Sequence, residues 1–364
     1  NFPAKSFLVP EPLGLCLVIG AWNYPYNVSI LPLVSAIAAG NTVVLKPSEI
    51  ASHTSKAMAA LFNNELNTEA ICVIEGGVEQ TSIILEQKFD KIFFTGSTRV
   101  GKIIYAKAAE KLTPVTLELG GKSPAIFTES ADLKMGIKRM VWAKFLNAGQ
   151  TCIAPDYCVV HHSIKDKFLK LLIAEIKQAN YSIENDNYVQ IINSDNTKRL
   201  IELIEGATVF YGGDYDLGKR IISPTILNNV SFEDAIMESE IFGPLLPVIE
   251  YDDINDLFLK LQSRPKPLAA YMFTSKKEVK KKFTKELSFG GGAINEVIMQ
   301  FTNPKLPFGG VGESGFGNYH GKKGFSDFSH YKSIMDKPTF FELSLKYSPY
   351  SLRNFKWIKK LLRL

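Results

Sequence analysis

The sequence predicts an α/β protein built on a doubly wound, parallel sheet with a second α/β domain attached. Short β-branched runs alternate with helical stretches in the first third of the chain, and the connections are short. The pair Gly120-Gly121 then offers a hinge. The length of 364 residues exceeds one ordinary core, so two domains are the default expectation.

The first third of the chain accounts for the parallel sheet. Strands are expected at four apolar runs: Leu15–Ile19, Thr42–Leu45, Ile71–Ile74 and Lys91–Phe94. Helices are expected between and after them: Val28–Ala39, His53–Leu66, Val78–Glu86 and Val100–Lys111. This order is typical of a Rossmann-like sheet, which binds ligands at the carboxyl ends of its strands.

The second part of the chain begins after the strand-like run Val115–Glu118. Helices are expected there at four stretches: Asp132–Leu146, Ile164–Ala179, Asn196–Glu205 and Asp253–Gln262. We therefore expect a cofactor domain at residues 1–117, a catalytic domain at 118–320 and a carboxyl-terminal segment at 321–364.

Charge and cysteine usage exclude several classes of protein. The net charge of +5 comes largely from the last residues, so the body is near neutral and a nucleic-acid partner is not expected. Four cysteines are too few for a disulfide framework, and Cys16, Cys72 and Cys158 are each expected to be small core residues in strands. The five histidines lack the spacing of a metal site. A reducing, cytoplasmic setting fits.

No segment predicts a membrane span. No apolar run reaches the roughly 20 residues that cross a bilayer, and no signal peptide is visible after Asn1. The end of the chain is different, because Leu352, Phe355, Ile358, Leu361 and Leu362 recur at helical spacing among basic residues. Such a helix either lies on an anionic membrane, covers a substrate entrance or docks on its own subunit.

The most informative segment is Asn147–Cys152. It places a cysteine just past a Gly-centred turn, behind the predicted helix Asp132–Leu146. A thiol held there by backbone takes a lowered pKa where a positive or dipolar neighbour is supplied. Cys152 is therefore the candidate nucleophile.

Two polar residues supply what a nucleophilic cysteine needs. Asn23 lies between aromatic residues and before Pro25, which makes it a preorganised N–H donor for an oxyanion, or an ordinary turn residue. Glu118 lies between two leucines, where burial would raise its pKa and make it a general base. A structural, ion-paired carboxylate is the alternative for Glu118.

Three further segments predict a nucleotide site. The run Gly96, Ser97, Thr98, Arg99, Val100, Gly101 follows a strand and opens a helix, where backbone N–H groups favour a phosphate. It nearly matches the P-loop of nucleotide triphosphatases, but Ile103 stands where a hydroxyl should bind magnesium. Lys46 and Glu49 follow another strand and can address ribose hydroxyls, or form an exposed loop with Ser48 as a helix cap.

The last segment is Glu240–Pro244, an acid and an aromatic residue before a Gly-Pro turn, although Phe242 could simply be a core residue. Taken in order, the six segments between residues 22 and 244 resemble the NAD(P)-dependent aldehyde dehydrogenase superfamily. The later segments Pro307–Gly315 and Tyr319–Gly324 look like its class 3 branch, which includes fatty aldehyde dehydrogenases. This chain has Glu313 where that branch often has Asn.

The resemblance implies roles for the named residues. Cys152 would attack the aldehyde, Asn23 with the backbone N–H of Cys152 would hold the oxyanion, and Glu118 would activate the water that hydrolyses a thioester. The cofactor would be NAD, with NADP also usable. Its contacts would be Lys46 and Glu49 at the adenosine ribose, Gly96–Gly101 at the pyrophosphate, and Glu240 with Phe242 at the nicotinamide ribose.

The resemblance also implies a homodimer acting on a small-molecule aldehyde, with the segment 321–364 serving assembly. Family members usually begin with further residues of the cofactor domain, so an amino-terminal segment is expected to be missing from this sequence. Two other classes stay open. One is a P-loop phosphotransferase, disfavoured by Ile103, and the other is a catalytically silent binding protein of the same fold.

Overall fold

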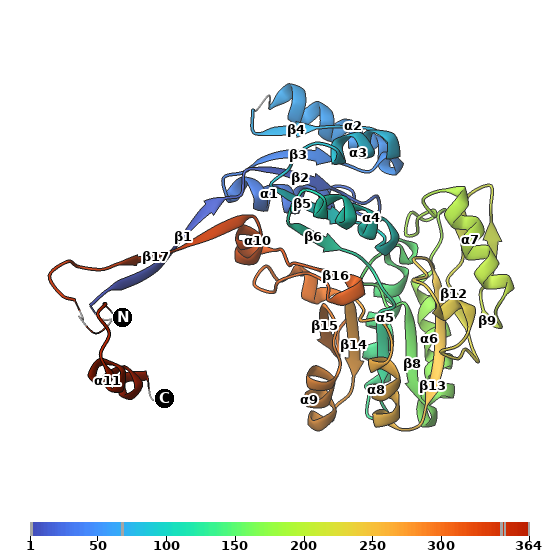
Figure 1. Cartoon of the computed structure of the whole chain (residues 1–364). Coiled ribbons are helices and arrows are strands. Elements are labelled where there is room, and N and C mark those ends of the chain that lie inside the picture. Colours follow the sequence, from blue (N-terminus) through green and yellow to red (C-terminus); the bar gives the residue numbers. More distant parts are fainter. Residues whose placement is uncertain (1–2, 67–68, 343–344, 346, 363–364) are drawn as a thin grey trace. The chain divides into compact units, whose positions relative to one another are not determined.

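The computed structural model describes residues 3–66, 69–342, 345 and 347–362, so Asn1 and Arg363 lie outside the described residues. The chain divides into two compact units (Figure 1). We call Pro12–Ser329 the body, and Asn1–Glu11 with His330–Leu364 the arm.

The first sheet of the body has six strands in the order β16-β6-β5-β2-β3-β4. All neighbours are parallel except β16, which runs antiparallel to β6. Their bounds are β2 (Leu15–Ile19), β3 (Thr42–Lys46), β4 (Ile71–Val73), β5 (Lys91–Thr95), β6 (Val115–Glu118) and β16 (Gly315–Phe316). The predicted doubly wound parallel sheet is confirmed.

Helices connect these strands as expected. They are α1 (Asn27–Ala38), α2 (Ser52–Ala59), α3 (Val78–Leu85) and α4 (Thr98–Ala109), with a 3-10 turn at Glu49–Ala51 before α2 and a π-helical turn at Ala60–Glu65 after it. Successive side chains of a strand point to opposite faces. Cys16 and Val18 therefore pack with Phe93 in one core cluster, while Leu17 and Ile19 pack in another. Burial on both faces explains the continuous apolar runs.

The second sheet has seven strands in the order β15-β14-β7-β8-β13-β12-β9. Only β9 is antiparallel to its neighbour. The strands are β7 (Pro124–Phe127), β8 (Tyr157–His161), β9 (Val209–Tyr211), β12 (Thr225–Leu227), β13 (Leu245–Tyr251), β14 (Ala269–Phe273) and β15 (Gly291–Ile294). A small hairpin is formed by β10 (Tyr215–Asp216) and β11 (Ile221–Ile222).

Helices again lie between these strands. They are α5 (Leu133–Phe145), α6 (Lys165–Ala179), α7 (Ser194–Glu205), α8 (Ile254–Gln262), α9 (Lys277–Glu286) and, after the second sheet, α10 (Gly321–Asp327). The four predicted helices of this half are confirmed within two residues at each end. Asp132 caps α5 by accepting a hydrogen bond from the Met135 N–H at 3.1 Å.

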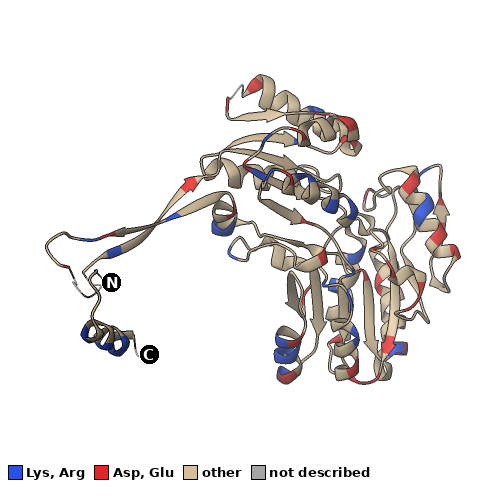
Figure 2. Cartoon of the chain, in the orientation of Figure 1, with Lys and Arg blue, Asp and Glu red and all other residues tan. Residues whose placement is uncertain are grey.

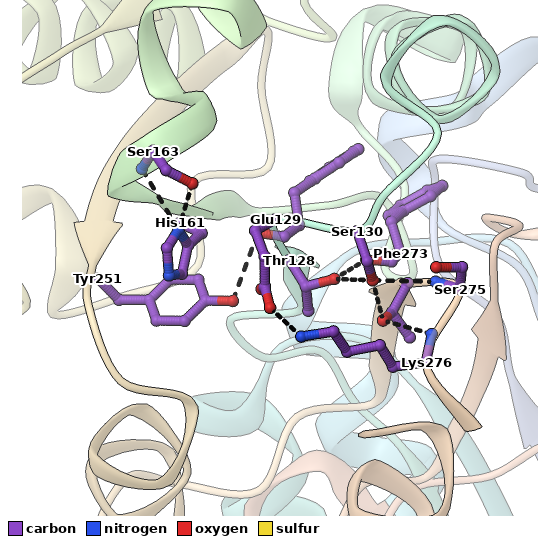
Figure 3. A network of polar contacts seen from close by, with 11 residues as sticks. Thr128, Glu129, Ser130, His161, Ser163, Tyr251, Phe273, Ser275 and Lys276 are labelled. Atoms are coloured by element: carbon purple, nitrogen blue, oxygen red, sulfur yellow. Dashed lines mark hydrogen bonds and ion pairs between the residues drawn. The ribbon is translucent and has the colours of Figure 1, made fainter. Parts of the chain in front are cut away.

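The carboxyl edge of the second sheet is closed by polar contacts (Figure 3). The Ser130 hydroxyl lies 2.9 Å from the Thr274 hydroxyl and 3.0 Å from that of Thr128, which joins the ends of β7 and β14. Glu129 and Lys276 form an ion pair across the same gap. These groups satisfy one another and fix the loops at this edge.

The arm contains a two-stranded sheet and a helix. Strands β1 (Lys5–Pro12) and β17 (Ser329–Asp336) pair with each other, and an ion pair joins Lys332 to Glu11 at 2.6 Å. The helix α11 (Leu352–Leu362) confirms the predicted carboxyl-terminal helix as far as it is described. Lys and Arg gather on it without an acidic residue (Figure 2).

One cysteine prediction is wrong. Cys16 and Cys158 are fully buried, but Cys72 is exposed, because its side chain points to the opposite face of the edge strand β4 from the buried Val73. Among the described residues, no helix is both long and apolar enough to cross a membrane. The described part of the chain also contains no group of three or more metal-ligating side chains.

Candidate active site

The predicted site segments meet between the two sheets of the body. Trp22–Pro25, Lys46–Glu49, Gly96–Gly101 and Glu118 follow or end the parallel strands β2, β3, β5 and β6, so they lie at one edge of the first sheet. The segments that carry Cys152 and Glu240 precede β8 and β13, at the amino edge of the second sheet. The chain crosses between the two edges through Leu119–Ser123.

Cys152 follows a tight left-handed turn. Asn147, Ala148 and Gly149 have φ values of 53°, 50° and 73°. A Cβ at Gly149 would come within 2.3 Å of the Gly243 carbonyl oxygen, so only glycine fits there. This close approach packs the turn before Cys152 against the turn that follows Glu240.

One amide side chain to which the sequence analysis gave no role, that of Gln150, holds this turn. The Gln150 side chain donates to the Asn147 carbonyl at 3.0 Å and to the Gln190 carbonyl at 3.2 Å. It also accepts from the Ile192 N–H at 2.9 Å. Gln150 directly follows Gly149 and lies two residues before the predicted nucleophile, and this position is the signal that could have identified it.

Asn23 is brought to the cysteine loop, as expected. Its Nδ2 donates to the Gln150 carbonyl at 3.1 Å, and the Asn147 Nδ2 donates back to the Asn23 carbonyl at 3.1 Å. The neighbouring Tyr24 hydroxyl lies 2.7 Å from the Thr151 hydroxyl. The amide nitrogen of Asn has two N–H donors, and the bond to Gln150 uses one of them.

Glu118 is a buried carboxyl group at the end of β6. It is 1% exposed, and neither of its oxygens has a hydrogen-bond partner among the described residues. Burial raises its pKa well above the ordinary value for Glu, and the charge of Asp327 adds to this. The ion-paired alternative finds no support, since none of the described cations pairs with Glu118.

The thiol of Cys152 departs from its expected chemistry. Burial, together with the charges of Glu240 and Glu118, raises its pKa to about 12, and the backbone N–H groups of Cys152 and Ile153 offset this rise only in part. A lowered pKa requires a positive or dipolar neighbour, but carboxylates are the charges nearest here. The thiol is therefore protonated at neutral pH and needs a base to ionise it.

The two ribose candidates lie side by side after β3. Lys46 is 2% exposed, and its Nζ donates to the Pro47 carbonyl at 2.8 Å and to the Glu49 Oε2 at 3.4 Å. Ser48 caps the following turn by accepting from the Ile50 N–H at 3.3 Å. The half-exposed Glu49 carboxylate is thus held by Lys46 at one oxygen, and its other oxygen is open to a ligand.

The glycine-rich segment forms the start of α4, which begins at Thr98, two residues earlier than expected. Ser97 caps the helix through the Val100 N–H at 3.4 Å. A Cβ at Gly101 would approach the Leu119 side chain to 2.7 Å, so the glycine lets the helix pack closely on the crossing segment. The strand order reverses between β2 and β5, which is where doubly wound sheets bind dinucleotides.

Glu240 and Phe242 lie in the loop before β13 of the second sheet and face the edge of the first sheet. Gly121 donates its backbone N–H to Glu240, whose pKa burial and the charge of Asp156 raise to about 8. Phe242 is only partly buried and packs edge-on against Trp22, with ring centroids 5.3 Å apart. Phe242 is therefore a contact between the two sheets and not an interior core residue.

A cleft of about 380 Å³ runs from the start of α4 to Glu240. Its lining includes Thr98, Gly120, Gly121, Lys122, Glu240 and Lys266, and does not reach Cys152. The open helix start, the anchored Glu49 and this cleft together fit a dinucleotide such as NAD.

Known proteins match this arrangement over nearly the whole chain. Residues 3–334 match the aldehyde dehydrogenase family. The 4,4'-diaponeurosporen-aldehyde dehydrogenase of Staphylococcus aureus is 44% identical over 98% of this chain and 79% of its own length. The mouse (Mus musculus) aldehyde dehydrogenase, dimeric NADP-preferring, is 46% identical over 90% of this chain and 73% of its own.

Solved structures agree. The substrate-bound state of Staphylococcus aureus AldH superposes with a TM-score of 0.95 at 44% identity, covering 99% of this chain and 80% of that one. A Mycobacterium tuberculosis aldehyde dehydrogenase complexed with NAD+ gives 0.85 at 30% identity, covering 93% and 72%. Nothing in these matches supports a P-loop phosphotransferase. The chain belongs to the aldehyde dehydrogenase family, as an NAD(P)-dependent enzyme that oxidises aldehydes to carboxylic acids.

Proposed function

We propose that Cys152, Asn23 and Glu118 carry out this oxidation. The observation that supports it most is a buried carboxylate without a hydrogen-bond partner, Glu118, whose charge reaches the thiol in the loop bound to Asn23. Glu118 takes the proton of the Cys152 thiol, and the sulfur attacks the carbonyl carbon of the aldehyde. The oxyanion accepts from Asn23 Nδ2 and from the backbone N–H of Cys152.

The second half of the reaction is hydrolysis. Bound NAD would supply the acceptor for the hydride that leaves the substrate carbon, and a thioester on Cys152 remains. Glu118 gives up the thiol proton to solvent and then accepts a proton from the water that attacks this thioester. It passes this second proton to the sulfur as the acid leaves, which restores the thiol. The raised pKa of Glu118 suits both proton transfers, because it makes the carboxylate a stronger base near neutral pH.

The cofactor contacts come from the carboxyl edge of the first sheet and from the loop before β13 of the second. Lys46 and Glu49 would hold the adenosine ribose, the start of α4 at Gly96–Gly101 would hold the pyrophosphate, and Glu240 with Phe242 would hold the nicotinamide ribose. The anchoring of Glu49 by Lys46 supports a preference for NAD, since a fixed carboxylate bonds a 2′-hydroxyl and repels a 2′-phosphate.

Glu49→Gln is expected to reduce this preference. The amide still bonds the 2′-hydroxyl but no longer repels a phosphate, so the affinity for NADP should rise about tenfold while that for NAD changes little. Quenching of intrinsic fluorescence on titration with each cofactor measures both dissociation constants. Glu75→Gln, another exposed acid of the first sheet, is the control. A wild-type protein that prefers NADP would overturn the role of Glu49.

We propose the domain boundaries that the sequence predicts. Residues 1–117 form the cofactor domain and 118–320 the catalytic domain, in keeping with the two sheets of the body. Residues 321–364 serve assembly as a homodimer, a state that the name of the mouse relative also gives. Four free cysteines support a cytoplasmic location.

The arm helix α11 is proposed to contact an anionic membrane surface. Leu352, Phe355 and Trp357 are each more than half exposed, and Lys359 and Lys360 lie over the rings of Phe355 and Trp357. A helix with exposed apolar side chains and basic neighbours is suited to an anionic lipid interface.

Removal of residues 341–364 is therefore expected to abolish sedimentation of the protein with anionic liposomes. Full-length protein should sediment with vesicles containing phosphatidylserine and remain in solution with phosphatidylcholine vesicles. Replacing Phe355 and Trp357 by Ser is the matched variant, and should weaken binding without changing the net charge. Equal, negligible sedimentation of the full-length and shortened proteins would remove the membrane role.

A further inference from the structure

A closed triangle of buried polar groups lies close to Glu118. The Lys91 Nζ donates to the Thr116 hydroxyl at 2.7 Å, and that hydroxyl donates to the Asp327 Oδ2 at 2.7 Å. Lys91 and Asp327 also form an ion pair at 3.2 Å, with side chains only 6% and 12% exposed. Burying an ion pair carries a desolvation cost, so the presence of this pair needs an explanation other than packing.

The register of the first sheet places this triangle on the same face as Glu118. Phe93 of β5 lies opposite Thr116 of β6, and Thr95 lies opposite Glu118. Side chains two residues apart on a strand share a face, so Thr116 and Glu118 point the same way, as do Lys91 and Thr95. The buried Thr95 hydroxyl, like Glu118, has no hydrogen-bond partner among the described residues.

Hydrogen bonds from the described part of the chain therefore do not set the basicity of Glu118. Burial is the larger cause of its raised pKa, and the charge of Asp327 on α10 adds to it. Two further ionisable groups interact with Glu118, namely Tyr319 in the segment before α10 and Cys152 in its loop. Tyr319 is neutral at physiological pH, since burial raises its pKa well above the ordinary value.

We propose that Asp327, held in place by Lys91 and Thr116, is a positioning residue that makes Glu118 a stronger base. The proposal rests on the function proposed for Glu118. A fixed negative charge opposes ionisation of the neighbouring carboxyl group, so the carboxylate holds its proton more tightly once it has accepted one. Lys91 forms an ion pair with Asp327, and Thr116 fixes the direction of the Asp327 carboxylate.

The charge of Asp327 determines the direction in which the pH profile of hydrolysis shifts. Hydrolysis requires ionised Glu118, so its rate rises with pH through the pKa of that group. Asp327→Asn removes the negative charge, keeps an acceptor for Thr116 and leaves Lys91 positive. The pKa of Glu118 should then fall, and the acid limb of the pH profile should move to lower pH by about one unit. Asp327→Glu keeps the negative charge and should leave the limb close to its wild-type position.

Hydrolysis of p-nitrophenyl acetate tests this without cofactor. The ester acylates a thiol directly, and the steady release of nitrophenolate after the first turnover reports hydrolysis of the acyl-enzyme. We expect Asp327→Asn to hydrolyse about five times faster, relative to its own plateau, at one pH unit below the wild-type midpoint. Asp90→Asn is the matched control, since it makes the same charge change beside Lys91 at an exposed position.

The two variants and the control separate the outcomes. A shift to lower pH for Asp327→Asn, with no shift for Asp327→Glu or Asp90→Asn, supports the proposal, because only the first variant removes the buried negative charge. An acid limb that stays in place in a folded Asp327→Asn protein overturns it, and Thr116→Val, which releases the Asp327 carboxylate, decides the matter if that protein does not fold. Failure of the proposed function looks different: Cys152→Ala would then release nitrophenolate as fast as wild type.

Discussion

Glu118→Gln is expected to turn steady aldehyde oxidation into a single burst of NADH followed by very slow turnover. The amide keeps the shape of the side chain but cannot accept a proton, so the thioester on Cys152 forms and is hydrolysed slowly. Positioned base catalysis is worth about a hundred- to ten-thousand-fold, and the steady rate should fall on that order. Stopped-flow absorbance of NADH with a medium-chain aldehyde measures both phases.

The raised pKa of Cys152 makes the pH dependence of this burst informative. At neutral pH the thiol of the variant lacks its base, so the burst should be slow, and it should accelerate as the pH rises toward the thiol pKa of about 12. The steady rate should stay low throughout. Unchanged turnover in the variant would make Glu118 a structural carboxylate. A burst that is absent at every pH would confine its role to the thiol.

Cys152→Ala is expected to abolish aldehyde oxidation, by more than about ten-thousand-fold, while NAD still binds with nearly the wild-type dissociation constant. The substitution removes the only atom that bonds the substrate covalently, whereas the proposed cofactor contacts are made by other residues. Initial-rate assays and fluorescence titration with NAD give the two quantities. Cofactor affinity lost together with activity would indicate a collapsed site.

The remaining cysteines provide the controls. Cys72 is exposed on β4, so Cys72→Ser should leave the rate unchanged. Cys158 is buried in β8, and Cys158→Ala should lower the melting temperature by a few degrees but keep activity, since the cavity is small. Activity that survives without Cys152 would contradict the mechanism.

Much of the first sheet could be predicted because its signals are local. Strands buried on both faces give uninterrupted apolar runs, and the predicted bounds of β2 and β6 agree with the structure at every residue. The pairing of β1 with β17 could not be predicted, because it joins segments more than 300 residues apart and leaves most of their side chains exposed. Two-residue strands such as β16 have no pattern to detect.

The residues of the active site likewise differ in whether their sequence signals are local. Cys152, Asn23 and Glu118 could be singled out because each stands in an unusual local context, and the structure places all three in the region between the two sheets. The raised pKa of Cys152 could not be predicted, since it comes from burial and from the charges of Glu240 and Glu118, which lie far away in the sequence. Asp327 and Lys91 carry no local signal either; only the fold brings them to Glu118.

The division of the active site between two sheets has a consequence for how such enzymes diversify. Loops after β3 and β5 are proposed to contact the adenosine ribose and the pyrophosphate, whereas the loop before β8 carries the nucleophile. The preference between NAD and NADP can therefore change in separate lineages, or in separate rounds of laboratory evolution, without disturbing the nucleophile. Tolerance to change should be lowest at the crossing Glu118–Gly121, which carries the proposed base and lines the cofactor cleft.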